Sequence, residues 1–304
     1  MRNILLEERS ARDIDEVVAK ILRDLENPRP PLPLEIVRDL LALDRAYYSS
    51  TNTDMLRETV HRLRIGAKQV IRRPSLLLDV VRKRDLRALW VPDRRRILID
   101  SDLPSPKQRW GEAHEVGHSI IPWHDAMMHG DHARTLSVAC EEILEAEANY
   151  AAGRLLFLQD EFNERLLSGP VSFSHIKDLS KEFGNTMTST LWRAIETLEV
   201  PAFGLVTGHP KAPVAKGGKP LVRYFLRSPA FAERFATVTD IGLFNAVRRI
   251  TRGNKGPIGA GEVVIYDAAS VQHIFFMEVF FNGYDALTLG IYRRERVVSV
   301  SFSR

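Results

Sequence analysis

Cysteine is almost absent from this chain of 304 residues, which contains Cys140 alone. A lone cysteine cannot form an internal disulfide, so the sequence excludes a disulfide-stabilised fold and agrees with a reducing compartment. Long hydrophobic runs are also lacking, since no stretch approaches the roughly 18 to 20 apolar residues of a membrane span. The N-terminus turns acidic at Glu7 and Glu8, too early for a signal peptide. We therefore expect a cytoplasmic protein with no membrane segment.

A strong excess of one charge is missing too, because the net charge is +4 with a pI near 9.2. Basic residues nevertheless concentrate in one region: Arg62, Arg64, Lys68, Arg72, Arg73, Arg82, Lys83, Arg84, Arg87, Arg94, Arg95 and Arg96. Such a region can bind phosphates, but aromatic residues do not alternate with its basic residues as stacking on bases would require. We interpret it as a solvated face or a docking surface for an acidic protein, with nucleic acid as the alternative.

The chain does contain His114-Glu115-Val116-Gly117-His118. Residues four apart share a helical face, so both imidazoles can reach one ion while Glu115 stands beside the first. A zinc ion in such a site lowers the pKa of its water to about 7 and polarises an amide carbonyl. Glu115 can take the proton of the water and later deliver it to the leaving amine. The motif predicts a zinc hydrolase with His114 and His118 as ligands and Glu115 as the catalytic acid/base.

A third ligand can come from a second predicted helix, residues 141–158, which carries acidic residues among small ones. A carboxylate completes a His, His, Glu set and leaves the fourth position open for catalysis. Glu145 and Asn149 share a face, whereas Glu147 lies about 200° around the helix from Glu145, so both glutamates cannot bind one ion. We interpret Cys140 as a small packing residue before this helix rather than a zinc ligand.

These two segments resemble the ImmA/IrrE-type zinc metallopeptidases. That family has an "aHE-x-GH" helix followed by "E-x-EAN-x-(F/Y)-AA-x-(L/R)L". This chain has Ala113 before its His-Glu-Val-Gly-His segment, and later Glu145-Ala-Glu-Ala-Asn-Tyr-Ala-Ala-Gly-Arg-Leu-Leu156. The resemblance spans about residues 10–200. It implies Glu145 as the third metal ligand.

The resemblance also implies a function, which is cleavage of a helix-turn-helix repressor and derepression of stress or mobile-element genes. The hydrogen-bond donor that stabilises the transition state could be any of four residues: His124, His129, His132 or Tyr150. We expect the three histidines to lie on an exposed loop past the metal helix, with a contact to the site as the alternative.

Hydrophobic periodicity predicts helices at residues 11–25 and 33–43, and strands at 89–92 and 96–100 that lead to a metal helix starting at Ser105. Residues 174–198 predict two helices joined at Gly184, which resemble a helix-turn-helix. The second helix carries Arg193 as its one basic residue, so we favour a pair that closes the peptidase domain over one that reads DNA.

Beyond a Gly/Pro-rich stretch at 208–220 the pattern changes to a strand at 221–226, a helix at 240–250 and strands at 262–266, 274–281, 286–292 and 297–302. We predict an α+β protein. Residues 1–207 form a mainly helical, zincin-like peptidase domain with a small sheet and the helical pair 174–198. Residues 208–220 form a linker, and residues 221–304 an α+β sensory or binding module.

The predicted function is that of a zinc-dependent metallo-endopeptidase with a protein substrate. The alternative is a non-proteolytic regulator that binds a partner or DNA through the helical pair and the basic segment. Retention of Glu115 favours the enzyme, because a protein that only binds has no chemical need for a base beside the water.

Overall fold

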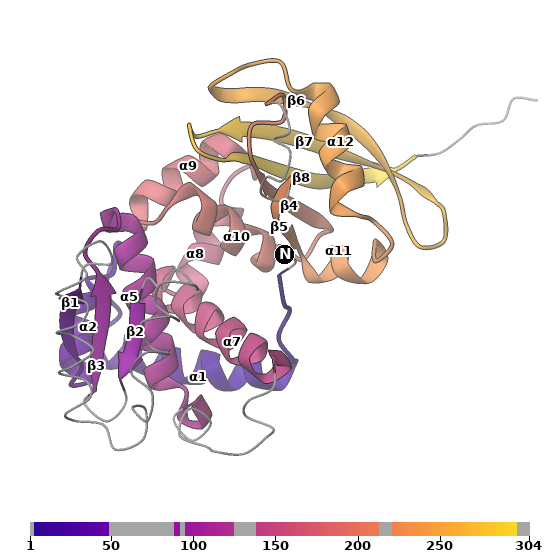
Figure 1. Ribbon diagram of the computed structural model, residues 1–304. Coiled ribbons are helices and arrows are strands. Elements are labelled where there is room, and N and C mark those ends of the chain that lie inside the picture. The colour runs from indigo at the N-terminus through magenta and orange to yellow at the C-terminus, as the bar shows by residue number, and fades with distance from the viewer. Residues whose placement is uncertain (1–2, 49–87, 92–94, 125–137, 213–220, 297–304) are drawn as a thin grey trace, which may run out of the picture. The chain divides into compact units, whose positions relative to one another are not determined.

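A computed structural model describes residues 3–48, 88–91, 95–124, 138–212 and 221–296 (Figure 1). The fold is α+β, as predicted. The chain divides into two compact units. One consists of Leu6–Phe162 with Lys181–Thr186, and the other of Met1–Leu5, Asn163–Ser180 and Met187–Arg304. Much of the predicted basic segment lies outside the described residues, as do His129, His132 and the predicted strand at 297–302.

The first unit combines a small mixed sheet with helices (Figure 1). Its helices include α1 (Glu8–Asp24) and α2 (Leu34–Leu40). The strands are β1 (Asp44–Tyr48), β2 (Ala88–Val91) and β3 (Arg96–Asp100) in the order β1-β3-β2. Strand β3 is parallel to β1 and antiparallel to β2. Its inner residues Ile97, Leu98 and Ile99 are buried, which explains the apolar run in the sequence.

Two longer helices of this unit, α5 (Ser105–Ile120) and α7 (Val138–Leu156), contain the two sequence motifs and pack against each other. They approach closely at Gly117, where an added Cβ atom would lie 2.6 Å from the carbonyl oxygen of Ala148. Only glycine fits at such a distance, because real Cβ atoms do not come this close to an oxygen. The glycine of the first motif therefore allows the backbone of the second motif helix to come this close.

A buried ion-pair network fixes the other side of α5. Glu112 is 4% exposed and pairs with Arg38 of α2 (Nε to Oε1, 2.6 Å) and Arg45 of β1 (Nη1 to Oε2, 3.0 Å). Burial of a carboxylate is tolerated here because two guanidinium groups compensate its charge. Glu112 precedes His114 by two residues, so this network helps to fix the rotation of α5 about its axis.

The second unit is built on an antiparallel sheet of five strands in the order β5-β4-β8-β7-β6. The strands are β4 (Ala202–Thr207), β5 (Val222–Arg227), β6 (Gly256–Tyr266), β7 (Gln272–Phe281) and β8 (Ala286–Glu295). Helices α8 (Asp160–Leu167), α9 (Phe173–Glu182), α10 (Met187–Thr197), α11 (Pro229–Arg234) and α12 (Asp240–Ile250) complete the described elements.

Both faces of this sheet are covered at β4 (Figure 1). On one face Phe203 and Leu205 of β4 join an aromatic-rich core that includes Phe231 of α11 and Phe244 of α12. On the other face Ile195 of α10 lies against Gly204 of β4. Neighbouring residues of a strand point to opposite faces, so β4 is buried along its whole length.

The compact units divide the chain differently from the predicted domains. Strand β4 hydrogen-bonds to both β5 and β8, so the predicted linker at 208–220 joins two neighbouring strands of one sheet. The helical pair is present as α9 and α10, but α10 packs on β4 and β5 and belongs to the sheet unit rather than closing the first one. Strand β4 was missed in the sequence because both of its faces are buried, so its six residues do not alternate between hydrophobic and polar. A separate function for residues 221–304 stays a prediction.

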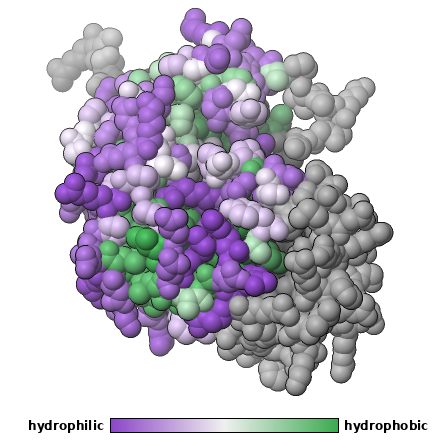
Figure 2. Space-filling view, turned by 90° about the vertical axis from the view of Figure 1, so that its left-hand side faces the viewer, coloured by the Kyte–Doolittle hydropathy of each residue, from purple (hydrophilic) through white to green (hydrophobic). Residues whose placement is uncertain are grey.

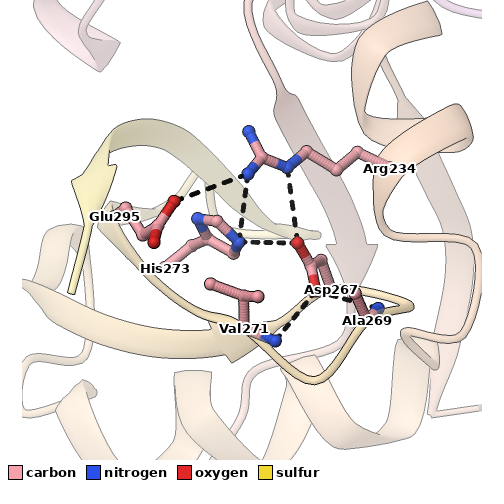
Figure 3. A network of polar contacts seen from close by, with 6 residues as sticks. All are labelled: Arg234, Asp267, Ala269, Val271, His273 and Glu295. Atoms are coloured by element: carbon pink, nitrogen blue, oxygen red, sulfur yellow. Dashed lines mark hydrogen bonds and ion pairs between the residues drawn. The ribbon is translucent and has the colours of Figure 1, made fainter. Parts of the chain in front are cut away.

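A network of polar contacts stabilises the turn between β6 and β7 (Figure 3). Asp267 accepts hydrogen bonds from the backbone amides of Ala269 (3.0 Å) and Val271 (2.9 Å), and from Nε2 of His273 (2.8 Å). Arg234 of α11 lies 3.5 Å from Asp267 and 3.9 Å from Glu295. The hydrogen bond from His273 lowers the pKa of Asp267, and His273 itself is fully buried.

On the face shown in Figure 2 hydrophilic residues predominate, and hydrophobic residues gather in its lower half. Among the described helices, none combines the length and apolar composition that crossing a bilayer requires.

Replacement of Gly117 by alanine should destabilise the protein, although alanine is the better helix former by about 1 kcal/mol. The new methyl group would force α5 and α7 apart, at a cost of about 1–3 kcal/mol. Urea unfolding measures the difference. In the control Gly169→Ala, the new Cβ meets only a His175 atom at 3.9 Å and should change stability little. An increase in stability for Gly117→Ala would contradict this close approach.

Asp267→Ala should lower the denaturant midpoint several times more than Glu295→Gln, which alters an exposed member of the same network. The alanine leaves buried His273 without its hydrogen-bond acceptor. The pKa of Asp267 is lower in the folded state than in the unfolded state. Its contribution to the free energy of unfolding is therefore fully present above the usual carboxyl pKa, and is lost as the pH falls through the lower pKa of the folded state. Equal midpoints for the two variants at neutral pH would rule out this role.

Candidate metal centre

The structure brings together the three residues predicted as metal ligands. His114 and His118 lie one turn apart on α5, and Glu145 faces them from α7. Their ligand atoms all lie within 4.8 Å of one another. Glu145 Oε2 is 3.2 Å from His114 Nε2, and Glu145 Oε1 is 3.6 Å from His118 Nε2. The two Nε2 atoms are 3.2 Å apart.

This donor set fits a divalent metal ion. Ligands at about 2.0–2.1 Å around a tetrahedral ion lie roughly 3.3 Å from one another, which is close to the three separations observed between nitrogen and oxygen atoms here. Two imidazoles and a carboxylate also form the three-ligand set of catalytic zinc sites. Glu145 is exposed, so the site is open to solvent on its side.

The electrostatics also suit a cation at this position. Burial lowers the pKa of His114, but its hydrogen bond with Glu145 and the charges of Glu115 and Glu145 outweigh burial, and the net shift is upward. Burial lowers the pKa of His118. The pKa of Glu145 is depressed, because its contacts with both histidines outweigh its own desolvation. The negative charges that stabilise a proton on an imidazole nitrogen also stabilise a metal cation bound in place of that proton.

Asn149 holds the outer nitrogen of the first histidine. Its Oδ1 lies 3.1 Å from His114 Nδ1, so an Nδ1–H group can donate to it. That tautomer leaves Nε2 of His114 unprotonated and directed toward His118 and Glu145. Asn149 and Glu145 therefore act on the same histidine from one face of α7, as their spacing of four predicted.

His124 holds the outer nitrogen of the second histidine. Its Nδ1 lies 2.9 Å from His118 Nδ1, and its Nε2 lies 2.9 Å from Oε2 of Glu147. Trp123 Nε1 donates to the same carboxylate oxygen at 2.7 Å. Burial raises the pKa of Glu147, but the hydrogen bonds from His124 and Trp123 bring it below its usual value.

The expectation of an exposed loop position was wrong for His124, which is 0% exposed. A histidine six residues after a metal-helix histidine carries a positional signal in the sequence, but only the fold shows what it contacts. Glu147 points away from the ion position, as its helical angle predicted, and binds His124 instead.

The remaining candidate residues lie at separate positions. Glu115 is buried next to His114, and its charge raises the pKa of that histidine. The Tyr150 hydroxyl donates to Asp15 of α1 at 3.1 Å. Cys140 lies in the first turn of α7.

Comparisons with known proteins find similarity over the segment that carries the candidate site. The sequence pattern of the IrrE N-terminal-like domain matches residues 68–194. The radiation response metalloprotease IrrE of Deinococcus radiodurans is 27% identical over 122 residues, which are 40% of this chain and 37% of that protein. The chain thus matches little more than a third of the length of that relative.

A solved structure of a Mycobacterium tuberculosis transcriptional regulator is similar in fold, with a TM-score of 0.53 and 14% identity over 94% of this chain and 90% of that chain. The predicted resemblance is confirmed by the domain match and by the IrrE relative. The similarity to the ImmA/IrrE-type metallopeptidases therefore holds for segment 68–194, which matches the IrrE N-terminal-like domain and contains both sequence motifs.

Proposed function

We propose that this protein is a zinc-dependent metallo-endopeptidase of the zincin type. One observation carries the proposal: His114, His118 and Glu145 converge from two helices, with Glu115 adjacent to the first ligand. Two imidazoles and one carboxylate leave a coordination position for water, which a structural zinc site does not. The family match supports a peptidase rather than another hydrolase.

The residues divide the chemistry between them. His114, His118 and Glu145 would hold the ion, which when bound activates water and polarises the scissile carbonyl. Glu115 accepts the proton of the attacking water and delivers it to the leaving amine. Asn149 keeps Nε2 of His114 available by accepting a hydrogen bond from Nδ1–H of the same ring. The close contact at Gly117 keeps α7, and with it Glu145, within reach of both histidines.

The substrate we propose is a protein, and specifically a helix-turn-helix repressor whose cleavage derepresses stress or mobile-element genes. The resemblance to the ImmA/IrrE family supports this substrate class. Within the described residues β2 lies at the edge of the small sheet and contacts α5. An extended peptide can add to such an edge through main-chain hydrogen bonds and so lie beside the metal helix.

The alternative, a regulator that binds DNA through the helical pair, is less well supported. Arg193 is the one basic residue of α10, and it is 6% exposed. A buried guanidinium cannot reach base edges or phosphates in a groove. Helix α10 packs on β4 and β5, with Ile195 against Gly204, as a structural helix does.

Loss of any one ligand should remove the metal. The purified protein should hold about one zinc ion per chain, and His114→Ala, His118→Ala and Glu145→Ala should each lose most of it, since three protein ligands leave none to spare. Elemental analysis after dialysis measures the content. Glu142→Gln, which changes an exposed carboxylate of the same helix, is the control. Full zinc content in Glu145→Ala would show that the third ligand is elsewhere.

Glu115→Gln should keep zinc but abolish cleavage, with a loss of at least about 10²-fold in rate, because an amide cannot accept the proton of the water. Co-expression with a helix-turn-helix repressor encoded in a neighbouring gene, followed by immunoblotting of that repressor, tests both substrate and chemistry. The same Glu142→Gln variant should cleave normally. A repressor that is inactivated equally by Glu115→Gln, without being cut, would support the non-proteolytic alternative.

A further inference from the structure

One buried cluster beside the metal centre has no part in the chemistry proposed above. It consists of buried His124 and Glu147 with half-buried Trp123, and it contacts the site through His118. His124 is 0% and Glu147 4% exposed. Burial of two titratable side chains costs folding free energy unless each polar atom has a hydrogen-bond partner. The hydrogen bonds of His124 and Glu147 therefore indicate what these residues do.

His124 stands at a position that in another class of zinc peptidases carries a metal ligand. In metzincins a third histidine follows the second by six residues, across an intervening glycine. His124 follows His118 by six residues, but Ile121 replaces the glycine. The nitrogen of His124 that approaches His118 meets Nδ1, on the far side of that ring from Nε2, His114 and Glu145. His124 therefore lies behind a ligand rather than beside it.

The donors and acceptors of this cluster permit one consistent arrangement of protons. Nε2 of His118 faces the other ligand atoms, so it must be unprotonated to bind a metal, and the ring proton lies on Nδ1. Nδ1–H of His118 then donates to Nδ1 of His124 over 2.9 Å. His124 consequently carries its own proton on Nε2, which donates to Glu147 over 2.9 Å.

We propose that His124 and Glu147 are positioning residues that fix the orientation and tautomer of His118, so that its Nε2 is always presented to the metal. Trp123 supports the chain by donating to the same oxygen of Glu147 and so holding that carboxylate in place. The carboxylate at the end of the chain also makes His118 a more basic ligand. This inference rests on the proposed metal site but is independent of peptide cleavage.

A packing role is the simpler explanation of a buried histidine, and it predicts different behaviour. If His124 only filled space, an apolar side chain of similar volume would serve as well. If it transmits hydrogen bonds, a side chain with an acceptor and a donor is required. Glutamine can accept from His118 through its oxygen and donate to Glu147 through its nitrogen, whereas leucine can do neither.

The test compares His124→Leu with His124→Gln in the full-length chain, using Zn²⁺ in competition with a chromophoric chelator. His124→Leu should weaken zinc binding by about 10- to 100-fold, and His124→Gln should recover most of that loss. Glu147→Gln should weaken binding as well, while Glu142→Gln should not. Equal affinity in the leucine and glutamine variants would overturn the proposal and leave a packing role. Because metal affinity is the readout, this result is independent of whether the protein is a peptidase.

A second measurement uses the unsubstituted chain, in case the leucine variant fails to fold. In the zinc-loaded protein, ¹⁵N NMR of the histidine rings should show His118 protonated on Nδ1 and His124 protonated on Nε2. A zinc-bound Nδ1 on His118, or zinc on a nitrogen of His124, would contradict the proposal.

Discussion

The close approach of α5 and α7 is the constraint on which the candidate site depends. The two histidines are fixed relative to each other by their spacing on one helix, but the carboxylate comes from another. Glu145 reaches them because the α7 backbone at Ala148 lies against Gly117, with no room for a side chain between. A glycine inside a helix normally weakens it, and here it is the residue that allows the helices to touch. The buried pairing of Glu112 with two arginines then holds the rotation of α5.

The second motif acts as a unit because successive positions of α7 contact different neighbours. Glu145 and Asn149 share one face and act on His114, one through Nε2 and the other through Nδ1. Glu147 lies on another face and binds His124, which in turn contacts His118. The backbone of Ala148 lies against Gly117. Tyr150 and Arg154 bind Asp15 of α1 on the remaining side.

The local elements of this chain could be predicted from sequence, since amphipathic period and turn residues are local signals. The predicted helix 240–250 coincides with α12, and the predicted ligand atoms of His114, His118 and Glu145 converge. Helical angles also separated Glu145 from Glu147 correctly, because both lie on one regular helix.

What sequence reasoning missed depends on contacts between distant segments. Strand β1 (Asp44–Tyr48) pairs with β3 across about fifty residues, and its short polar sequence gives little periodic signal. Strand β4 was not predicted, because its partners β5 and β8 come later in the chain. His124 was expected on a loop, since nothing in the local sequence shows that Glu147 and His118 enclose it.

The most direct test of this account is X-ray absorption spectroscopy at the zinc edge of the metal-loaded, full-length protein. We expect an ion bound by two imidazole nitrogens, from His114 and His118, and by oxygen atoms of Glu145 and solvent, all at about 2.0–2.2 Å. Scattering from three imidazoles would show that His124 is a ligand rather than a positioning residue. A sulfur at about 2.3 Å would place Cys140 in the site. Either result would contradict the arrangement of ligands on which the proposed function rests.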